Sequence, residues 1–171
     1  MSKSTPSRPP IANATRAFHI VASRFNAQYV DGLIGHVTEE LRALAPHGTI
    51  LIHRVPGSFE IPVVAREVAI QNKTDAIIAC GVILKGETDH AQNLSRSVTN
   101  ALQRIAIEHG VPVIIVVLSF DNENQARARC LKNKINRGTE AARAAVEIAN
   151  VLSEVRKRQG TTVSKPRRDN G

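Results

Sequence analysis

The stretch AIIACGVILKGETDH, residues 76–90, decides the fold class of this chain. Residues 76–84 are almost all apolar and lack the alternation of a strand that has one face in water. A continuous apolar run of this length is typical of a strand covered on both faces, as in a parallel sheet. Residues 85–90 turn polar and contain a glycine, which is typical of a loop. We therefore expect a buried strand that ends in a polar loop.

Other strands and helices alternate on both sides of this stretch. Strand character is found in the short apolar or β-branched runs at residues 17–22, 49–55 and 111–118. Helical spacing, or a helix start signal, is found at residues 30–44, 60–71, 94–105, after Asp121 or Asn122, and at 141–152. Strands joined by helical crossovers lie parallel, so we expect an α/β fold, a three-layer α/β/α sandwich with a four-stranded parallel sheet.

The length of 171 residues fits one globular domain, and charge separates this domain from its two ends. Residues 1–16 carry three basic residues and no acid, and residues 156–171 carry six basic residues and one acid. The chain's net charge of +8 therefore resides in its ends. Both ends are poor in large apolar residues, so we expect a flexible arm (1–16), a folded domain (17–155) and a flexible basic tail (156–171).

The composition also excludes several classes of protein. No apolar run approaches the length of a membrane span or of a signal peptide, so we expect a cytoplasmic protein without a membrane partner. An organellar transit peptide stays an alternative for residues 1–16, which contain Arg and Ser but no acid. Cys80 and Cys130 lack metal-ligand spacing, so we expect no disulfide and no metal site.

Ligands of open parallel sheets bind beyond the carboxyl ends of the strands, so the residues that follow the first two strands are site candidates. Phe25 can stack on a flat heterocycle and Asn26 can read its edge. The alternative is a hydrophobic staple at Phe25 and a helix N-cap at Asn26. After the second strand, the Pro56-Gly57 turn exposes backbone groups, and Glu60 can bind hydroxyls or only complement a helix dipole.

The third and fourth strands are followed by residues that suit an anion and proton transfer. Gly86 and Thr88 lie where a loop enters a helix, which favours phosphate. His90 follows them and titrates near neutral pH, although a histidine at a helix start is more often a capping or surface residue. Past the fourth strand, an arginine such as Arg129 can complete an anion site, although a solvated basic helix face is the alternative.

Four blocks in fixed order resemble the signature blocks of the lumazine synthases. They are RFN (24–26), VPGSFEIP (55–62), GVILKGETDH (81–90) and NRGTEAA (136–142). The second and third blocks are specific and the other two are supporting; the resemblance covers residues 17–155. It implies a flavodoxin-like fold and no cofactor. The implied reaction condenses 5-amino-6-(D-ribitylamino)uracil with 3,4-dihydroxy-2-butanone 4-phosphate to 6,7-dimethyl-8-ribityllumazine, phosphate and water.

The resemblance also implies roles for individual residues. His90 is the expected catalytic residue, paired with Asp89 or Glu87. The expected substrate-binding residues are Phe25, Asn26, Gly57, Ser58, Phe59, Glu60, Val82, Ile83, Leu84, Lys85, Gly86, Glu87, Thr88, Ile115, Arg129 and Arg137. In this family the arginine matched by Arg129 comes from the neighbouring subunit of a ring-shaped pentamer. A homo-oligomer is therefore expected, as a pentamer or an assembly of pentamers, with riboflavin synthase as a candidate partner.

Two departures from the family pattern leave a second function open. Ile115 stands where some relatives place an aromatic residue, and Ala91-Gln92 follow the histidine where aromatic residues are common. The main alternative is therefore a riboflavin- or lumazine-binding module, or a scaffold, with little catalysis. A nucleic-acid partner suits the basic ends but not the neutral body, which has no basic stripe interleaved with aromatics. A response-regulator domain is excluded, because residues 81–83 offer no phosphoacceptor aspartate.

Overall fold

The computed structural model describes residues 7–86 and 90–161, and it describes side chains over 7–86 and 91–158. Strands and helices alternate along the chain, as expected. The elements are β1 (Ala17–Ser23), α1 (Ala27–Leu44), β2 (Thr49–Val55), the 3₁₀ helix η1 (Ser58–Glu60), α2 (Ile61–Ile70), β3 (Ala76–Leu84), α3 (His90–His109), β4 (Val113–Phe120), α4 (Glu123–Cys130) and α5 (Arg137–Thr161).

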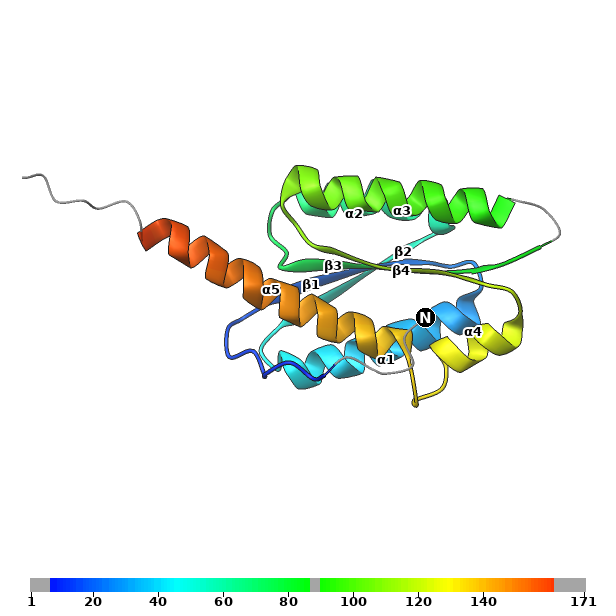
Figure 1. Cartoon of the computed structure of the whole chain (residues 1–171), viewed down its shortest axis with the longest axis horizontal. Helices are drawn as coiled ribbons and strands as arrows, with labels where there is room; N and C mark the ends of the chain where they lie inside the picture. The colour runs from blue at the N-terminus through cyan, green and yellow to red at the C-terminus, as the bar shows by residue number, and fades with distance from the viewer. Residues whose placement is uncertain (1–6, 87–89, 162–171) are drawn as a thin grey trace, which may run out of the picture.

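The four strands form one parallel sheet in the order β2-β1-β3-β4. Helices α2 and α3 cover one face of this sheet, and helices α1, α4 and α5 cover the other (Figure 1). The expected three-layer, flavodoxin-like α/β arrangement is therefore confirmed. Because all strands run the same way, β1, β2 and β3 deliver the turns that follow them to one edge of the sheet.

Strand β3 lies at the centre, and its apolar sequence matches that position. Eight of its nine residues are buried, and Leu84 is half-buried. Ile78 packs in the core beneath α1 and α5, whereas Ile77 and Ala79 pack beneath α2 and α3. Continuous rather than alternating hydrophobicity thus reflects burial on both faces. The edge strand β2 contrasts with β3, because only its last residue, Val55, is buried.

Local contacts set the starts of β4 and α4. The fourth strand begins at Val113 instead of residue 111, because Pro112 has no N–H to donate to a strand ladder. Its carbonyl still accepts a hydrogen bond of 2.8 Å from the Ile77 N–H. Of the two candidate caps for α4, Asn122 is the N-cap, since its side-chain oxygen accepts from the Gln125 N–H at 3.0 Å.

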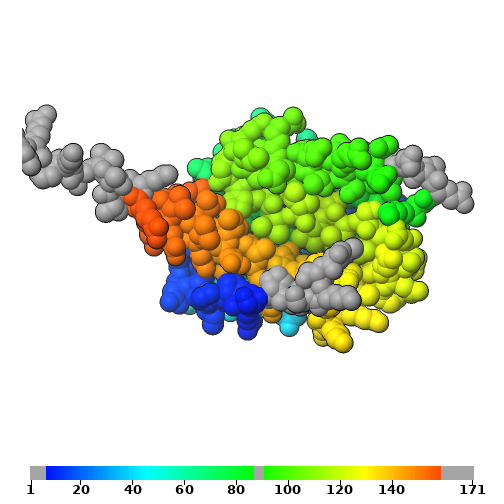
Figure 2. Space-filling model, viewed as in Figure 1, coloured from blue at the N-terminus to red at the C-terminus, as the bar shows by residue number. Residues whose placement is uncertain are grey.

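Residues 7–16, the described segment before β1, have no regular secondary structure, yet they contact the body. The Ala12 N–H donates to the Leu44 carbonyl at 2.7 Å, and Arg8 pairs with Glu40 at 3.0 Å. At the other end, α5 continues to Thr161, and its C-terminal end projects beyond the rest of the molecule (Figure 2). Contacts with the body therefore begin before residue 17, and α5 continues past residue 155. The division into arm, domain and tail stays a prediction.

Candidate active site

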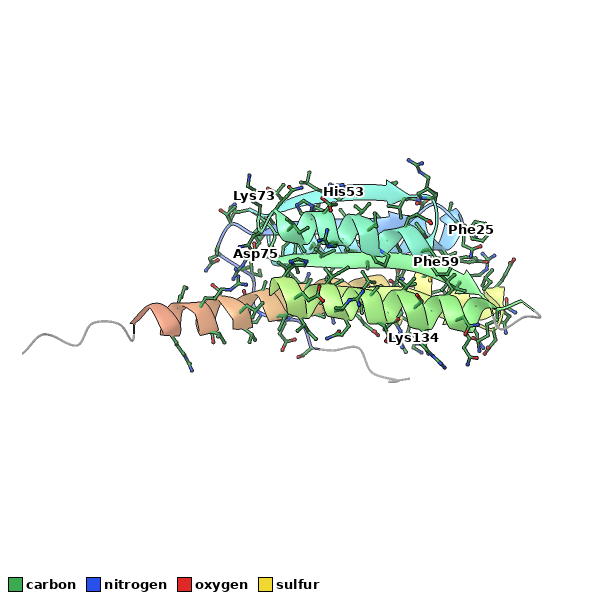
Figure 3. The ribbon with its side chains drawn as sticks, turned by 90° about the horizontal axis from the view of Figure 1, so that it is seen from above. Phe25, His53, Phe59, Lys73, Asp75 and Lys134 are labelled. Carbon is green, nitrogen blue, oxygen red and sulfur yellow. The ribbon has the colours of Figure 1, made fainter. Side chains whose placement is uncertain are left out.

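A cavity of about 430 Å³ lies where β1, β2 and β3 end. Its lining joins three separate segments of the chain, and Phe25 and Phe59 lie at this same end of the molecule (Figure 3). The lining residues are Phe25, Asn26, Gly57, Ser58, Phe59, Glu60, Val82, Ile83, Leu84, Gly86, Ala91 and Leu94. Most of the residues expected to bind substrate are therefore brought together in one place.

The turn after β1 is held against the turn after β2 by backbone hydrogen bonds. The Arg24 N–H donates to the Val55 carbonyl at 2.8 Å, and the Phe25 N–H donates to the Pro56 carbonyl at 3.3 Å. The Phe25 ring stays 72% exposed, although it borders the cavity. An aromatic ring this exposed does not staple a helix, and it presents a face on which a planar ligand can stack.

Asn26 precedes α1, but its side chain does not cap this helix. Its backbone adopts a left-handed conformation with φ of 55°, which asparagine tolerates better than most residues. The side-chain Nδ2 instead donates to the Val82 carbonyl at 2.8 Å. The amide therefore links the end of β1 to the end of β3 and stands at the cavity wall, where a ligand can compete for its hydrogen bonds.

The turn after β2 places a carboxylate on the cavity rim. Glu60 closes η1, and its Oε2 accepts from the Gly57 N–H at 2.8 Å. The carboxylate is exposed, and a carboxylate oxygen can accept more than one hydrogen bond. Glu60 therefore keeps acceptor capacity for hydroxyl groups while its own backbone turn holds it in place. Phe59, which is 52% exposed, adds a second aromatic to this rim.

Close packing between Ser58 and Gly81 fixes this turn on the sheet. Ser58 is buried, and a Cβ built on Gly81 would lie 2.7 Å from its Oγ and 3.3 Å from a Val117 methyl. Only glycine leaves that space in the middle of β3. Gly81, in the third sequence block, therefore leaves room for Ser58, in the second block. The spacing of the residues in the sequence did not predict this contact.

Helix α3 completes the cavity with two apolar residues that were not among the expected substrate-binding residues, although Ala91 was noted as a departure from the family pattern. Ala91 and Leu94 extend the buried stripe of α3 toward its first turn, and this periodicity was the available signal. His90 is the first residue of α3 and precedes Ala91 directly. The His90 side chain lies outside the described residues, as do Glu87, Thr88 and Asp89.

Lys85 does not line the cavity, although Leu84 and Gly86 do; it forms an ion pair instead. Its Nζ lies 2.5 Å from Asp121 Oδ1, and its backbone N–H donates to the Phe120 carbonyl at 2.9 Å. The hydrogen bond from Lys85, followed by one from Gln125, lowers the pKa of Asp121 below its ordinary value. This pair joins the ends of β3 and β4 beside the candidate site.

Three expected site residues lie elsewhere in the same chain. Arg129 lines a separate cavity of about 690 Å³ over α4, together with Lys132 and Lys134. Ile115 and Arg137 line a third cavity, of about 380 Å³, between β4 and α5. Within one chain, these residues do not border the cavity that contains Phe25.

Neither thiol has the character of a nucleophile. Cys80 and Cys130 are buried and unbridged, and burial raises the pKa of each to about 12. Thiolates are the reactive form, so both residues act as small apolar groups at neutral pH. Over the described ranges, His, Cys, Asp and Glu form no group of three that could hold a metal ion. None of the helices in those ranges combines the length and apolar character needed to cross a bilayer.

One solved structure resembles this chain only weakly. A GDSL-like lipase from Bacteroides thetaiotaomicron is 12% identical with a TM-score of 0.37, over 83% of this chain and 65% of that one. This likeness is too weak to bear on fold or function.

Comparison with known sequences is decisive. Residues 15–153 match the family model for 6,7-dimethyl-8-ribityllumazine synthase. The synthase of that name from Paraburkholderia phymatum is 40% identical, over 77% of this chain and 75% of its own length. Those from Azoarcus sp. and Nitrosospira multiformis are 39% and 36% identical, over 78% and 77% of this chain and 83% and 81% of their own lengths. The chain therefore belongs to the 6,7-dimethyl-8-ribityllumazine synthase family.

Proposed function

We propose that the cavity at the ends of β1, β2 and β3 is the site where this lumazine synthase joins its two substrates. One is 5-amino-6-(D-ribitylamino)uracil and the other is 3,4-dihydroxy-2-butanone 4-phosphate. The observation that carries the proposal is the convergence of three separate turns on one cavity, lined by Phe25, Asn26, Glu60 and the end of β3. These residue types suit a planar, hydroxyl-rich ligand.

The pyrimidine is held by stacking and by backbone edges. The exposed face of Phe25 stacks on the ring, and the amide of Asn26 bonds its polar edge. Val82, Ile83 and Leu84 also line the cavity, and their backbone borders the pyrimidine. Gly57, Ser58 and Phe59 hold the turn against the ring and ribityl chain, and Glu60 accepts hydrogen bonds from the ribityl hydroxyls.

The phosphate and the proton transfers belong to the loop that leads into α3. Gly86 lines the cavity, and α3 begins at His90, so its N-terminal N–H groups and helix dipole suit a phosphate held by Gly86, Glu87 and Thr88. Imine formation, phosphate elimination and ring closure all require proton transfer, which suits an imidazole at His90. The reaction has no net oxidation or reduction, so this account assigns no cofactor.

A second copy of the chain completes the site in this account. Arg129 borders a different cavity from Phe25 within one chain, and this separation supports assigning the guanidinium that contacts the substrate phosphate to a neighbouring copy. Ile115 and Arg137, which line the cavity between β4 and α5, also take part in the site. Lys85 supports the site through its ion pair with Asp121. The expected assembly is a ring-shaped pentamer, or several pentamers, in the cytoplasm, with riboflavin synthase as a candidate partner.

The second candidate function is a riboflavin- or lumazine-binding protein with little catalysis. The observation that favours it is Ile115 at a position where some relatives place an aromatic residue over the ligand. Loss of one stacking surface weakens or reshapes binding, but it removes no group that transfers protons.

Turnover separates the two functions. Purified protein is mixed with both substrates, and lumazine formation is compared with the spontaneous reaction and with His90→Ala. A synthase forms lumazine well above the background, and the variant is slower by about 10²- to 10⁴-fold, the usual contribution of general acid–base catalysis. Background-level formation by wild-type protein that binds lumazine would contradict catalysis and favour the binding protein.

A further inference from the structure

A second polar cavity lies at the opposite edge of the sheet from the candidate active site. Its volume is about 360 Å³, and it lies between the start of β1, the residue before β3 and the far part of α5. Figure 3 shows Asp75, one of its lining residues, at the end of the molecule away from Phe25 and Phe59. The lining residues are Arg16, Asp75, Ala149, Leu152, Ser153, Arg156 and Lys157.

Arg16 is fixed in the wall of this cavity. Its two terminal nitrogens donate to Asp75 Oδ1 and Asn150 Oδ1, each at 2.9 Å, and its side chain is only 11% exposed. Its Nε is buried and has no hydrogen-bond partner among the described residues. A buried donor without a partner carries a desolvation cost, so the guanidinium in this wall is held with one donor unsatisfied.

The carboxylate in the lining is already engaged. Asp75 accepts from Arg16 through Oδ1 and from the Ala17 N–H through Oδ2 at 2.8 Å. The lining contains three basic side chains and this one carboxylate, so its formal charge is +2. Arg156 is held near the cavity by donating to the Gly110 carbonyl at 2.9 Å. The cavity therefore has a positive field and several donors in defined places.

These features select a class of ligand. A single carboxylate would neutralise only half of the excess charge, whereas a phosphate group carries about 1.5–2 charges at neutral pH and a diphosphate carries more. Both also have enough oxygens for arginine, lysine and a serine hydroxyl. Among the described residues, no aromatic side chain lines the cavity, so none of them stacks on a base. We infer that this cavity binds a small phosphate-bearing anion, a diphosphate or sugar phosphate, between Arg16, Ser153, Arg156 and Lys157.

Calorimetric titration of pyrophosphate into the full-length assembled protein tests this inference. All chains carry Arg129→Ala, so that the phosphate partner proposed for the active site is absent. Lys157→Gln and Arg156→Gln are compared with Arg158→Gln, which removes the same charge from the same helix outside the cavity lining. Loss of one charge-assisted contact weakens binding roughly tenfold in the first two variants and leaves the control unchanged.

Three outcomes overturn the inference, two of them in the pyrophosphate titrations. One is the absence of pyrophosphate binding to the parent chain, and the other is an equal loss of affinity in Lys157→Gln and Arg158→Gln, which would show only non-specific attraction to a basic helix. Citrate, a tricarboxylate whose charge at neutral pH is close to that of pyrophosphate, is expected to bind more weakly than pyrophosphate, and equal affinity for the two would contradict the assigned class. The readout is binding, so failure of the proposed synthase activity would leave it untouched.

Discussion

The ring of Phe25 is exposed and borders the cavity, so its removal should affect substrate binding directly. Phe25→Ala should raise the KM for the ribitylaminouracil by about 10- to 100-fold, since stacking of an aromatic side chain on a base contributes about 1–3 kcal/mol. The KM for the butanone phosphate should change little. Steady-state kinetics with each substrate varied in turn measure both values.

Phe25→Tyr is the matched control, since it keeps the aromatic face and should keep the wild-type KM. A side chain that is 72% exposed contributes little to packing, so unfolding midpoints of both variants should match that of the parent. Equal KM values for Phe25→Ala and Phe25→Tyr would show that the ring does not contact the pyrimidine.

At the scale of single residues, the sequence predicted which residues lie at the site better than it predicted their contacts. The position of Phe25, Asn26 and Glu60 after two strands was enough to place them at one edge of the sheet. The bond from Asn26 to Val82, and the space that Gly81 leaves for Ser58, depend on three-dimensional packing between segments. No local pattern encodes contacts of that kind.

At the scale of elements, the contact between α1 and α5 depends on Gly138. A Cβ at this position would lie 2.5 Å from the Leu33 carbonyl oxygen, which is backbone and cannot rotate away. Gly138→Ala should therefore lower the free energy of unfolding by about 1–3 kcal/mol, the usual cost of overpacking. Chemical unfolding at fixed subunit concentration measures the change.

Gly35→Ala, in α1, is the control for this substitution. A Cβ at Gly35 meets no heavy atom within 4 Å. Alanine is a better helix former than glycine, so this variant should be more stable by about 0.5–1 kcal/mol. Equal destabilisation of the two variants would contradict the packing explanation.

A histidine pair between β1 and β2 makes the stability of the sheet depend on pH. His19 Nδ1 lies 3.0 Å from His53 Nε2, and burial, followed by the charge of His53, lowers the pKa of His19. The unfolded chain then takes up a proton at higher pH than the folded chain does. The stability that depends on His19 is therefore fully present above the unfolded pKa of about 6.5. It is lost as the pH drops from there through the lowered pKa of the folded state.

The urea midpoint should therefore decrease between about pH 7.5 and about pH 5.5, in the range where histidine titrates. His19→Gln should flatten this dependence, because the group with the lowered pKa is gone. His47→Gln, which changes an exposed histidine in the turn before β2, should keep the wild-type slope. An unchanged slope in His19→Gln would assign the effect to other groups.

Most elements could be predicted because burial on both faces and helical periodicity are local patterns. β2 and β3 have the expected bounds, and α1 contains the expected stripe. The shift of β4 past Pro112 and the extension of α5 from Arg137 to Thr161 were missed. In α5 the helical turns outside residues 141–152 include many polar residues, so the apolar pattern that marked the helix ended before the helix did.

At the scale of the whole molecule, one chain does not assemble every expected site residue. The cavity with Phe25 and the cavity with Arg129 are distinct, although both lie near the carboxyl edge of the sheet. Family membership follows from the sequence, whereas a site shared between two copies is our proposal from the separation of these two cavities. The central claim is therefore that each active site takes its Phe25 cavity from one copy and Arg129 from another.

Subunit mixing tests this claim most directly. His90→Ala and Arg129→Ala chains are each expected to be nearly inactive; they are unfolded together in equal amounts, refolded, and assayed for lumazine formation. If sites are shared, random assembly rebuilds an intact site wherever the two variants meet in the right order, giving about a quarter of wild-type activity. Mixed assemblies no more active than the separate variants would contradict the claim, since they would place His90 and Arg129 in the same chain's site.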